Sequence, residues 1–138
     1  MMLSPIDRLD ILEVVARADT AATQRDADAY VSCFTSDAVL EGEMGSVHGN
    51  EALRESVGPI WEAEGLSSVH ATLNTVVAPV EDQPNCAVAT SILLILRTTS
   101  PPSIHSVSAI TQHLVKSASR WLIERRSVAA VGGAHAEQ

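Results

Sequence analysis

The chain has 138 residues, which fits one domain, and its 46% hydrophobic against 19% charged residues indicate a folded globular protein. Nine Lys and Arg against 17 Asp and Glu give a formal net charge of −8, which argues against binding nucleic acid or an anionic membrane through a broad basic face. The one local basic cluster, Arg120–Arg126, is interrupted by apolar residues 121–123 and is interpreted as a strand whose charged residues point outwards.

The N-terminal third predicts two helices. Ser4, Pro5 and Asp7 fit the capping residue, first turn and third position of a helix that should end near residues 24–25. One face of this helix is expected to carry the residues that recur at steps of three and four, namely Leu12, Val15, Ala16, Asp19, Ala22 and Thr23. Asp26 should cap a second, short helix, which residues 35–37 then break.

A short strand is predicted at residues 38–41, followed by a glycine-rich turn and a possible return strand at 47–49. Asn50 can cap a third helix from residue 51 to about 64, which Gly65 ends and Pro59 should kink or divide.

The second half of the chain predicts four long strands. They span 69–80, 86–97, 104–116 and 121–131, and their short connections favour an antiparallel meander. Helices followed by such a sheet predict an α+β domain over residues 1–131, in which the sheet wraps around the first helix and encloses a cavity. Residues 132–138 are expected to form a disordered tail.

The sequence shows no sign of a membrane or export segment. The longest apolar run, Ser91–Leu96, is strand-sized, and the N-terminus lacks the hydrophobic stretch of a signal peptide. A cytoplasmic location is therefore expected. Cys33 and Cys86 stand outside any metal or redox motif, which favours two reduced thiols.

Five segments, in this order along the chain, resemble the SnoaL-like superfamily, which includes ketosteroid-isomerase-like and nuclear transport factor 2-like proteins. The resemblance covers about residues 5–131 and is carried by residues 11–29, Cys33–Val39 (CFTSDAV), His48–Leu53 (HGNEAL), Val69–Asn74 (VHATLN) and 114–123 (LVK…WLI). It implies a cone-shaped α+β barrel with an apolar pocket, usually dimeric through the sheet. Members of the superfamily include isomerases, dehydratases, polyketide cyclases and non-catalytic binding domains.

The resemblance makes His70 the main candidate for chemistry. In the dehydratase branch a histidine at this strand position is the general base and pairs with an aspartate late in the first helix. That aspartate position holds Thr23 here, while Asp19 lies one helical turn earlier on the same face. For Asp19 the favoured interpretation is the wet edge of the helix, and the alternative is a buried carboxylate beside His70. The alternative for His70 is a packing role.

Further candidates surround this position. The steroid-isomerase positions hold Ala18 and Gly42, although Glu41, next to Gly42, could supply a carboxylate. Asn74 shares a strand face with His70 and could orient a ligand carbonyl, and Trp61 could cover the pocket. Substrate contact is also assigned to His113, although the sequence leaves open whether it or its neighbour Gln112 faces the cavity.

Two hypotheses follow for function. The first is an enzyme that isomerises, dehydrates or cyclises an apolar cyclic or ketone substrate, with His70 as base and Asp19 and Thr23 orienting it. No cofactor or metal is expected, because no histidine pair has metal-ligand spacing. The second is a non-catalytic ligand-binding or dimerisation domain. A homodimer is expected in either case.

Overall fold

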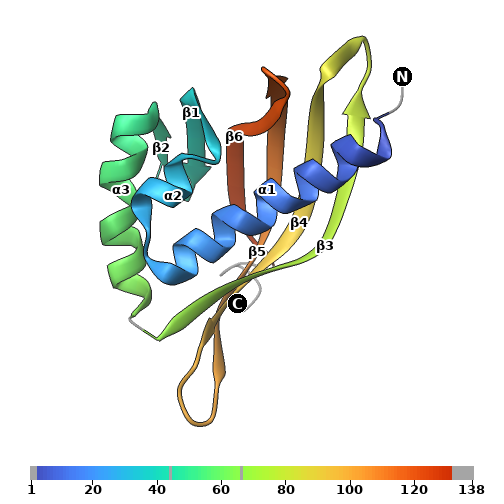
Figure 1. Cartoon of the computed structure of the whole chain (residues 1–138). Helices are drawn as coiled ribbons and strands as arrows, with labels where there is room; N and C mark the ends of the chain where they lie inside the picture. The colour runs from blue at the N-terminus through green and yellow to red at the C-terminus, as the bar shows by residue number, and fades with distance from the viewer. Residues whose placement is uncertain (1–2, 44, 66, 132–138) are drawn as a thin grey trace.

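The computed structural model describes residues 3–43, 45–65 and 67–131; the predicted tail at 132–138 lies outside these ranges. Three helices and six strands follow one another along the chain (Figure 1): α1 (Pro5–Gln24), α2 (Ala27–Val31), β1 (Phe34–Gly42), β2 (Gly45–His48), α3 (Asn50–Glu64), β3 (Ser68–Val80), β4 (Gln83–Arg97), β5 (Ser103–Ser117) and β6 (Arg120–Ala130). None of the helices in these described ranges is long and apolar enough to cross a membrane.

The six strands form one curved sheet in the order β2-β1-β6-β5-β4-β3. Strands β3 to β6 make the antiparallel meander that the sequence predicts, and β1 joins β6 in parallel. Helix α1 crosses the sheet on its concave side, and α2 and α3 lie at the β1–β2 end (Figure 1). The sheet curves without closing, and the architecture confirms the predicted α+β cone.

Helix α1 begins and ends where the sequence predicts. The Ser4 hydroxyl accepts the Asp7 N–H at 3.0 Å, the Asp7 carboxylate accepts the Ser4 N–H at 3.4 Å, and Arg25 ends the helix in the left-handed conformation. The predicted buried face is wrong in part, because Leu12 and Ala16 are exposed. The true stripe is displaced by one residue, about 100° around the helix, and consists of Ile11, Val14, Val15, Ala18, Asp19, Ala21 and Ala22.

Two boundaries also differ from the prediction. Strand β1 begins at Phe34, so residues 35–37 belong to it, because Phe34 already pairs with Ile123 of β6 before an irregularity in the register. Helix α3 is capped by Gly49 instead of Asn50 and runs through Pro59 undivided. Pro59 lies on the exposed side of α3, where water can satisfy the backbone carbonyl that the proline leaves without a donor.

The core joins α1 to the inner face of the sheet and to α2 and α3. Tyr30 contacts Phe34 with ring centroids 5.0 Å apart and meets Trp61 edge to face at 5.5 Å, which fixes α3 against α2. Both cysteines are free thiols, Cys33 buried and Cys86 half-buried. The helices therefore cover one part of the concave face and leave the sheet accessible beside α3.

Candidate functional site

A cavity of about 330 Å³ lies between α3, the β1–β2 hairpin and the concave face of the sheet. Its volume is at the small end of the range for ligand pockets, roughly 300–1,000 Å³. Much of its wall is apolar, from Leu40, Val47, Val57, Ile60, Trp61, Leu93, Ile95 and Val128. The side chains that can ionise and line it are Tyr30, Glu41, Glu43, Glu64, His70 and Arg126. The cavity thus combines apolar walls with few polar groups, as binding sites for small molecules do.

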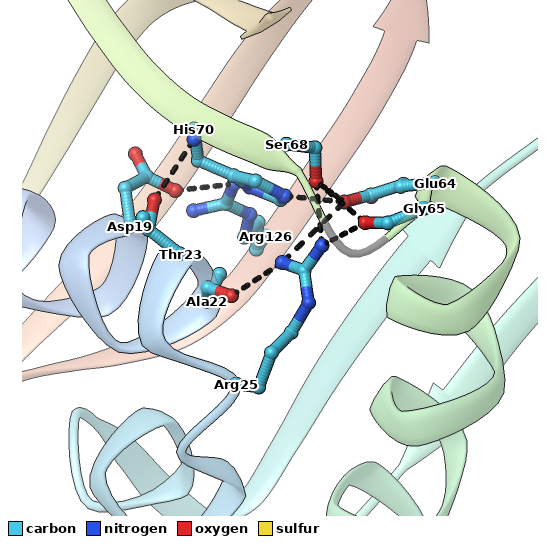
Figure 2. A network of polar contacts seen from close by, with 9 residues as sticks. All are labelled: Asp19, Ala22, Thr23, Arg25, Glu64, Gly65, Ser68, His70 and Arg126. Atoms are coloured by element: carbon cyan, nitrogen blue, oxygen red, sulfur yellow. Dashed lines mark hydrogen bonds and ion pairs between the residues drawn. The ribbon is translucent and has the colours of Figure 1, made fainter. Parts of the chain in front are cut away.

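His70 lines the cavity from β3 and pairs with Glu64, the last residue of α3. The His70 Nε2 lies 2.7 Å from Glu64 Oε1, and the two side chains are only 6% and 8% exposed (Figure 2). The chain turns back directly between them, since α3 ends at Glu64 and β3 starts at Ser68. Glu64 thus takes the place beside the imidazole that the sequence interpretation gave to Asp19 and Thr23.

Arg25 holds this turn in place from the C-terminus of α1. Its guanidinium donates to the Gly65 carbonyl at 2.6 Å, to the Ser68 hydroxyl at 2.5 Å and to the Ala22 carbonyl at 2.7 Å (Figure 2). The same guanidinium lies 3.9 Å from Glu64 Oε1. Because Arg25 ties α1 to both ends of the turn, the His70–Glu64 geometry depends on the packing of three elements.

The Glu64 contact assigns the histidine tautomer. A carboxylate only accepts hydrogen bonds, so in the neutral imidazole Nε2 carries the hydrogen and Nδ1 keeps its lone pair. Nδ1 is buried and has no hydrogen-bond partner among the described residues. A histidine fixed in this way can accept a proton at Nδ1 while Glu64 stabilises the cation that forms.

Thr23 and Asp19 lie near His70 but act on other groups. The Thr23 hydroxyl accepts the His70 backbone N–H at 2.9 Å and so positions the strand, not the ring. The favoured wet-edge interpretation of Asp19 is wrong: the residue is 3% exposed, accepts a hydrogen bond from Thr72, and pairs with Arg126 at 3.2 Å. A buried carboxylate needs such partners, and β3 and β6 supply them.

Arg126 contradicts the prediction that the basic residues of its strand point outwards. It is 3% exposed and donates to Asp19 at 3.2 Å and to Gln112 at 3.3 Å. The register between β5 and β6 shifts so that His113 pairs with Arg125 but Leu114 pairs with Ile123. This irregularity interrupts the alternation of inward and outward side chains along β6. As a result Arg126 lies on the same inner face as Ile123.

Burial keeps the Tyr30 phenol protonated, and the Asp19 carboxylate keeps Arg126 cationic. Burial raises the pKa of the Tyr30 phenol, and the positive charge of Arg126 only partly opposes this. Burial alone lowers the pKa of Arg126, but the Asp19 carboxylate 3.2 Å away opposes this and the net pKa is raised. Tyr30 is therefore a hydrogen-bond donor and Arg126 a permanent cation at the cavity.

The remaining predicted site residues separate into two groups. Trp61 and Glu41 line the cavity, although Glu41 is already engaged by Ser127 at 2.6 Å and Arg125 at 2.5 Å, which lower the pKa of its carboxyl. Asn74 and His113 are exposed and do not line it. A shift in register between Leu73 and Val76 turns Asn74 away from the face of His70, and on β5 the inward residue is Gln112.

Glu64 and Arg126 are the site residues that sequence reasoning missed. A signal for Glu64 existed, because it continues the buried stripe Leu53, Val57 and Trp61 of α3 at steps of four and three. Arg126 gave no such signal, since its inward position follows from the register shift. Among the described residues there is no cluster of three or more His, Cys, Asp or Glu side chains that could hold a metal ion.

Comparisons with known proteins identify the family. A search of curated proteins found no match. Among solved structures, a Nostoc punctiforme protein of unknown function with a cystatin-like fold superimposes with a TM-score of 0.87 at 21% identity, over 95% of this chain and 96% of that one. An NTF2-like protein with a cystatin-like fold from Novosphingobium aromaticivorans gives 0.82 at 24% identity, covering 94% and 85%. ActVI-ORFA from Streptomyces coelicolor gives 0.81 at 17% identity, covering 91% and 98%. The sequence model of the SnoaL-like domain matches residues 6–127, and the chain therefore belongs to the SnoaL-like domain family.

Proposed function

We propose that this protein binds a small apolar ketone in the cavity and catalyses a proton transfer on it without a cofactor, as an isomerase, dehydratase or cyclase. The observation that carries the proposal is the buried Nδ1 of His70, which has no partner among the described residues, on an imidazole held through Nε2 by Glu64 at the cavity wall. His70 is the general base, and Glu64, not Asp19 or Thr23, is the residue that orients its ring.

The proposed reaction begins with removal of a proton from the carbon next to the substrate carbonyl. Nδ1 of His70 is covered by neighbouring side chains in this structure, so the ring must move towards the substrate before Nδ1 takes the proton. The Glu64 carboxylate, 2.7 Å from Nε2, stabilises the imidazolium. Trp61 and the aliphatic wall hold the ring system of the substrate and limit the access of water. The proton then returns at another carbon, or a leaving group departs, which distinguishes isomerisation from dehydration.

Deuterium exchange into 2-tetralone, an apolar bicyclic ketone, tests the proposal. The protein in D₂O should exchange the protons next to the carbonyl faster than buffer does, as followed by NMR. His70→Gln should reduce the rate by roughly 10²–10⁴-fold, the usual contribution of a general base. Glu64→Gln should reduce it less, since the imidazole remains. His105→Gln is the matched control, because His105 is exposed on β5.

Exchange by the wild-type protein at the buffer rate would contradict the proposed reaction. Equal rates in the wild type and His70→Gln would exclude His70 as the base. Circular dichroism of both variants would check that the fold is retained, so that a lost rate reports on chemistry.

A non-catalytic binding domain is the second candidate function. It is favoured by Thr23, which replaces the aspartate of the resembling enzymes. The Thr23 hydroxyl accepts the backbone N–H of His70 and so makes no contact with the imidazole ring. This candidate predicts that 2-tetralone binds, seen as a change in tryptophan fluorescence through Trp61, but exchanges its protons no faster than in buffer. A cytoplasmic location stays a prediction from the sequence.

A further inference from the structure

Arg126 is a buried cation at the cavity wall that the proposed proton transfer does not use. It lines the same cavity as His70, and Figure 2 shows its guanidinium paired with Asp19. A guanidinium carries five N–H hydrogens, and the hydrogen bonds to Asp19 and Gln112 use two of them. Three hydrogens thus have no assigned acceptor among the described residues.

Among the described residues Asp19 is the anion paired with Arg126, and its carboxylate also accepts a hydrogen bond from Thr72. Gln112 contributes a neutral oxygen at 3.3 Å. In a buried, apolar setting a cation with free donors strongly stabilises a negative charge that forms beside it.

We propose that Arg126 binds the oxygen atom of the ligand that becomes negative when His70 removes a proton. This inference rests on the proposed function and extends the ligands of the site from enolisable ketones to small apolar molecules with an acidic phenol. The C–H bond breaks, the proton goes to Nδ1 of His70, and the electron pair moves onto the carbonyl oxygen, which Arg126 holds as an enolate. No oxidant or reductant takes part.

The pair 4-nitrophenol and nitrobenzene tests this role without any turnover. Nitrophenol and its phenolate absorb at different wavelengths, so the pH at which the bound molecule ionises can be read from its spectrum. Bound to the wild-type protein, nitrophenol should ionise at least one pH unit below the free molecule, a tenfold preference for the phenolate. Nitrobenzene has the same ring but no ionisable oxygen, and it reports whether the pocket itself is intact.

Two substitutions of the ion pair should move this ionisation in opposite directions. Arg126→Gln should raise the ionisation pH of bound nitrophenol to that of the free molecule or above, and Arg126→Lys should restore part of the shift. Asp19→Asn removes the competing anion and should lower the ionisation pH further. A residue that only supports the fold would weaken the binding of both probes in both variants. Arg120→Gln, at the exposed start of β6, is the matched control.

Each outcome decides the inference. An unshifted ionisation in a wild-type protein that binds nitrobenzene would overturn it, and so would shifts of the same sign in Asp19→Asn and Arg126→Gln. If Arg126→Gln fails to fold, the direction of the change in the ionisation pH of nitrophenol bound to Asp19→Asn still decides the inference, since only a decrease agrees with it. Loss of 2-tetralone exchange with a retained phenolate shift would overturn the proposed reaction and leave the role of Arg126 standing. If the wild-type protein binds neither probe, the role of Arg126 is overturned, and 2-tetralone exchange still decides the proposed reaction separately.

Discussion

Asp19 and Arg126 form an ion pair inside the molecule, with both side chains 4% exposed. Charges buried in this way are costly to desolvate, and the pair offsets that cost only while both members are present. The contributions of Asp19 and Arg126 to stability therefore depend on each other. Removal of either side chain leaves the other as a buried charge without a partner.

Replacement of one member should destabilise the protein strongly. We expect Asp19→Ala to lower the free energy of unfolding by about 3–5 kcal/mol, measured by urea denaturation. The double replacement Asp19→Leu with Arg126→Met should cost less than the two single changes added together, because no charge is left unpaired. Asp28→Asn breaks an exposed pair with Arg54 and should cost less than about 1 kcal/mol. A double variant whose loss of stability equals the sum of the two single losses would contradict the coupling between Asp19 and Arg126.

The lowered pKa of Asp7 predicts how the stability of the protein depends on pH. The indole N–H of Trp121, the Lys116 ammonium and Ser4 hold the pKa of Asp7 well below its ordinary value. A carboxyl whose pKa is depressed in the folded state stabilises the fold above its unfolded pKa, about 4, and loses this contribution as pH falls towards its folded pKa. Asp7→Asn should therefore be less stable than the wild type at neutral pH, and the difference should shrink in acid.

The measurement for Asp7 is urea denaturation of both proteins at neutral pH and below pH 4. Asp10→Asn, an exposed carboxylate on the same helix, is the control and should show a smaller difference from the wild type. A constant difference between Asp7→Asn and the wild type across the acid range would contradict the assignment.

Two glycines of the α3 region have opposite roles: Gly49 caps the helix from outside it, and Gly58 lies within it. Gly49, the residue before the first turn, has φ 92° and ψ 155°, a region that residues with a Cβ rarely adopt. Gly58 lies in the middle of the helix on its solvent-exposed side, and a Cβ added there meets nothing within 4 Å. The same chemical change should thus give effects of opposite sign at the two positions.

We expect Gly49→Ala to destabilise the protein by roughly 1–3 kcal/mol, the cost of such a backbone conformation. Gly58→Ala should stabilise it by up to about 1 kcal/mol, because alanine restricts the unfolded chain and favours the helix. Thermal unfolding of the two variants measures both effects. A change of the same sign in the melting temperature of both variants would contradict the positive φ assigned to Gly49.

At the scale of the whole molecule, strands β3 and β5 carry apolar side chains in contact with solvent. Leu73, Val76 and Ile104 are 41%, 63% and 59% exposed. We propose, with the expected homodimer in view, that a second copy covers these side chains. Val76→Asp with Ile104→Asp should then give a monomer in sedimentation velocity, with an unchanged circular dichroism spectrum. A monomeric wild-type protein would contradict the dimer.

The fold and parts of the site were predictable from the sequence because they depend on local patterns. The capping box at Ser4, the end of α1 near Arg25 and the four-strand meander all follow from neighbouring residues. His70 was also predicted to face the cavity, from its place in a short motif, and its position at the wall agrees with this.

Only the tertiary structure decided which polar groups meet. Glu64 reaches His70 because Arg25 fixes the turn between α3 and β3, and Arg126 reaches Asp19 because a register shift turns β6 by one position. The Arg126–Asp19 contact cannot be read from spacing, since it joins α1 to β6 and depends on an irregularity in the β5–β6 register. Glu64 and His70 are close in sequence, but the approach of their side chains depends on the turn that Arg25 holds. Burial then gives these groups their chemistry, because only inside the assembled cavity do the carboxylates and cations lose water and act on one another.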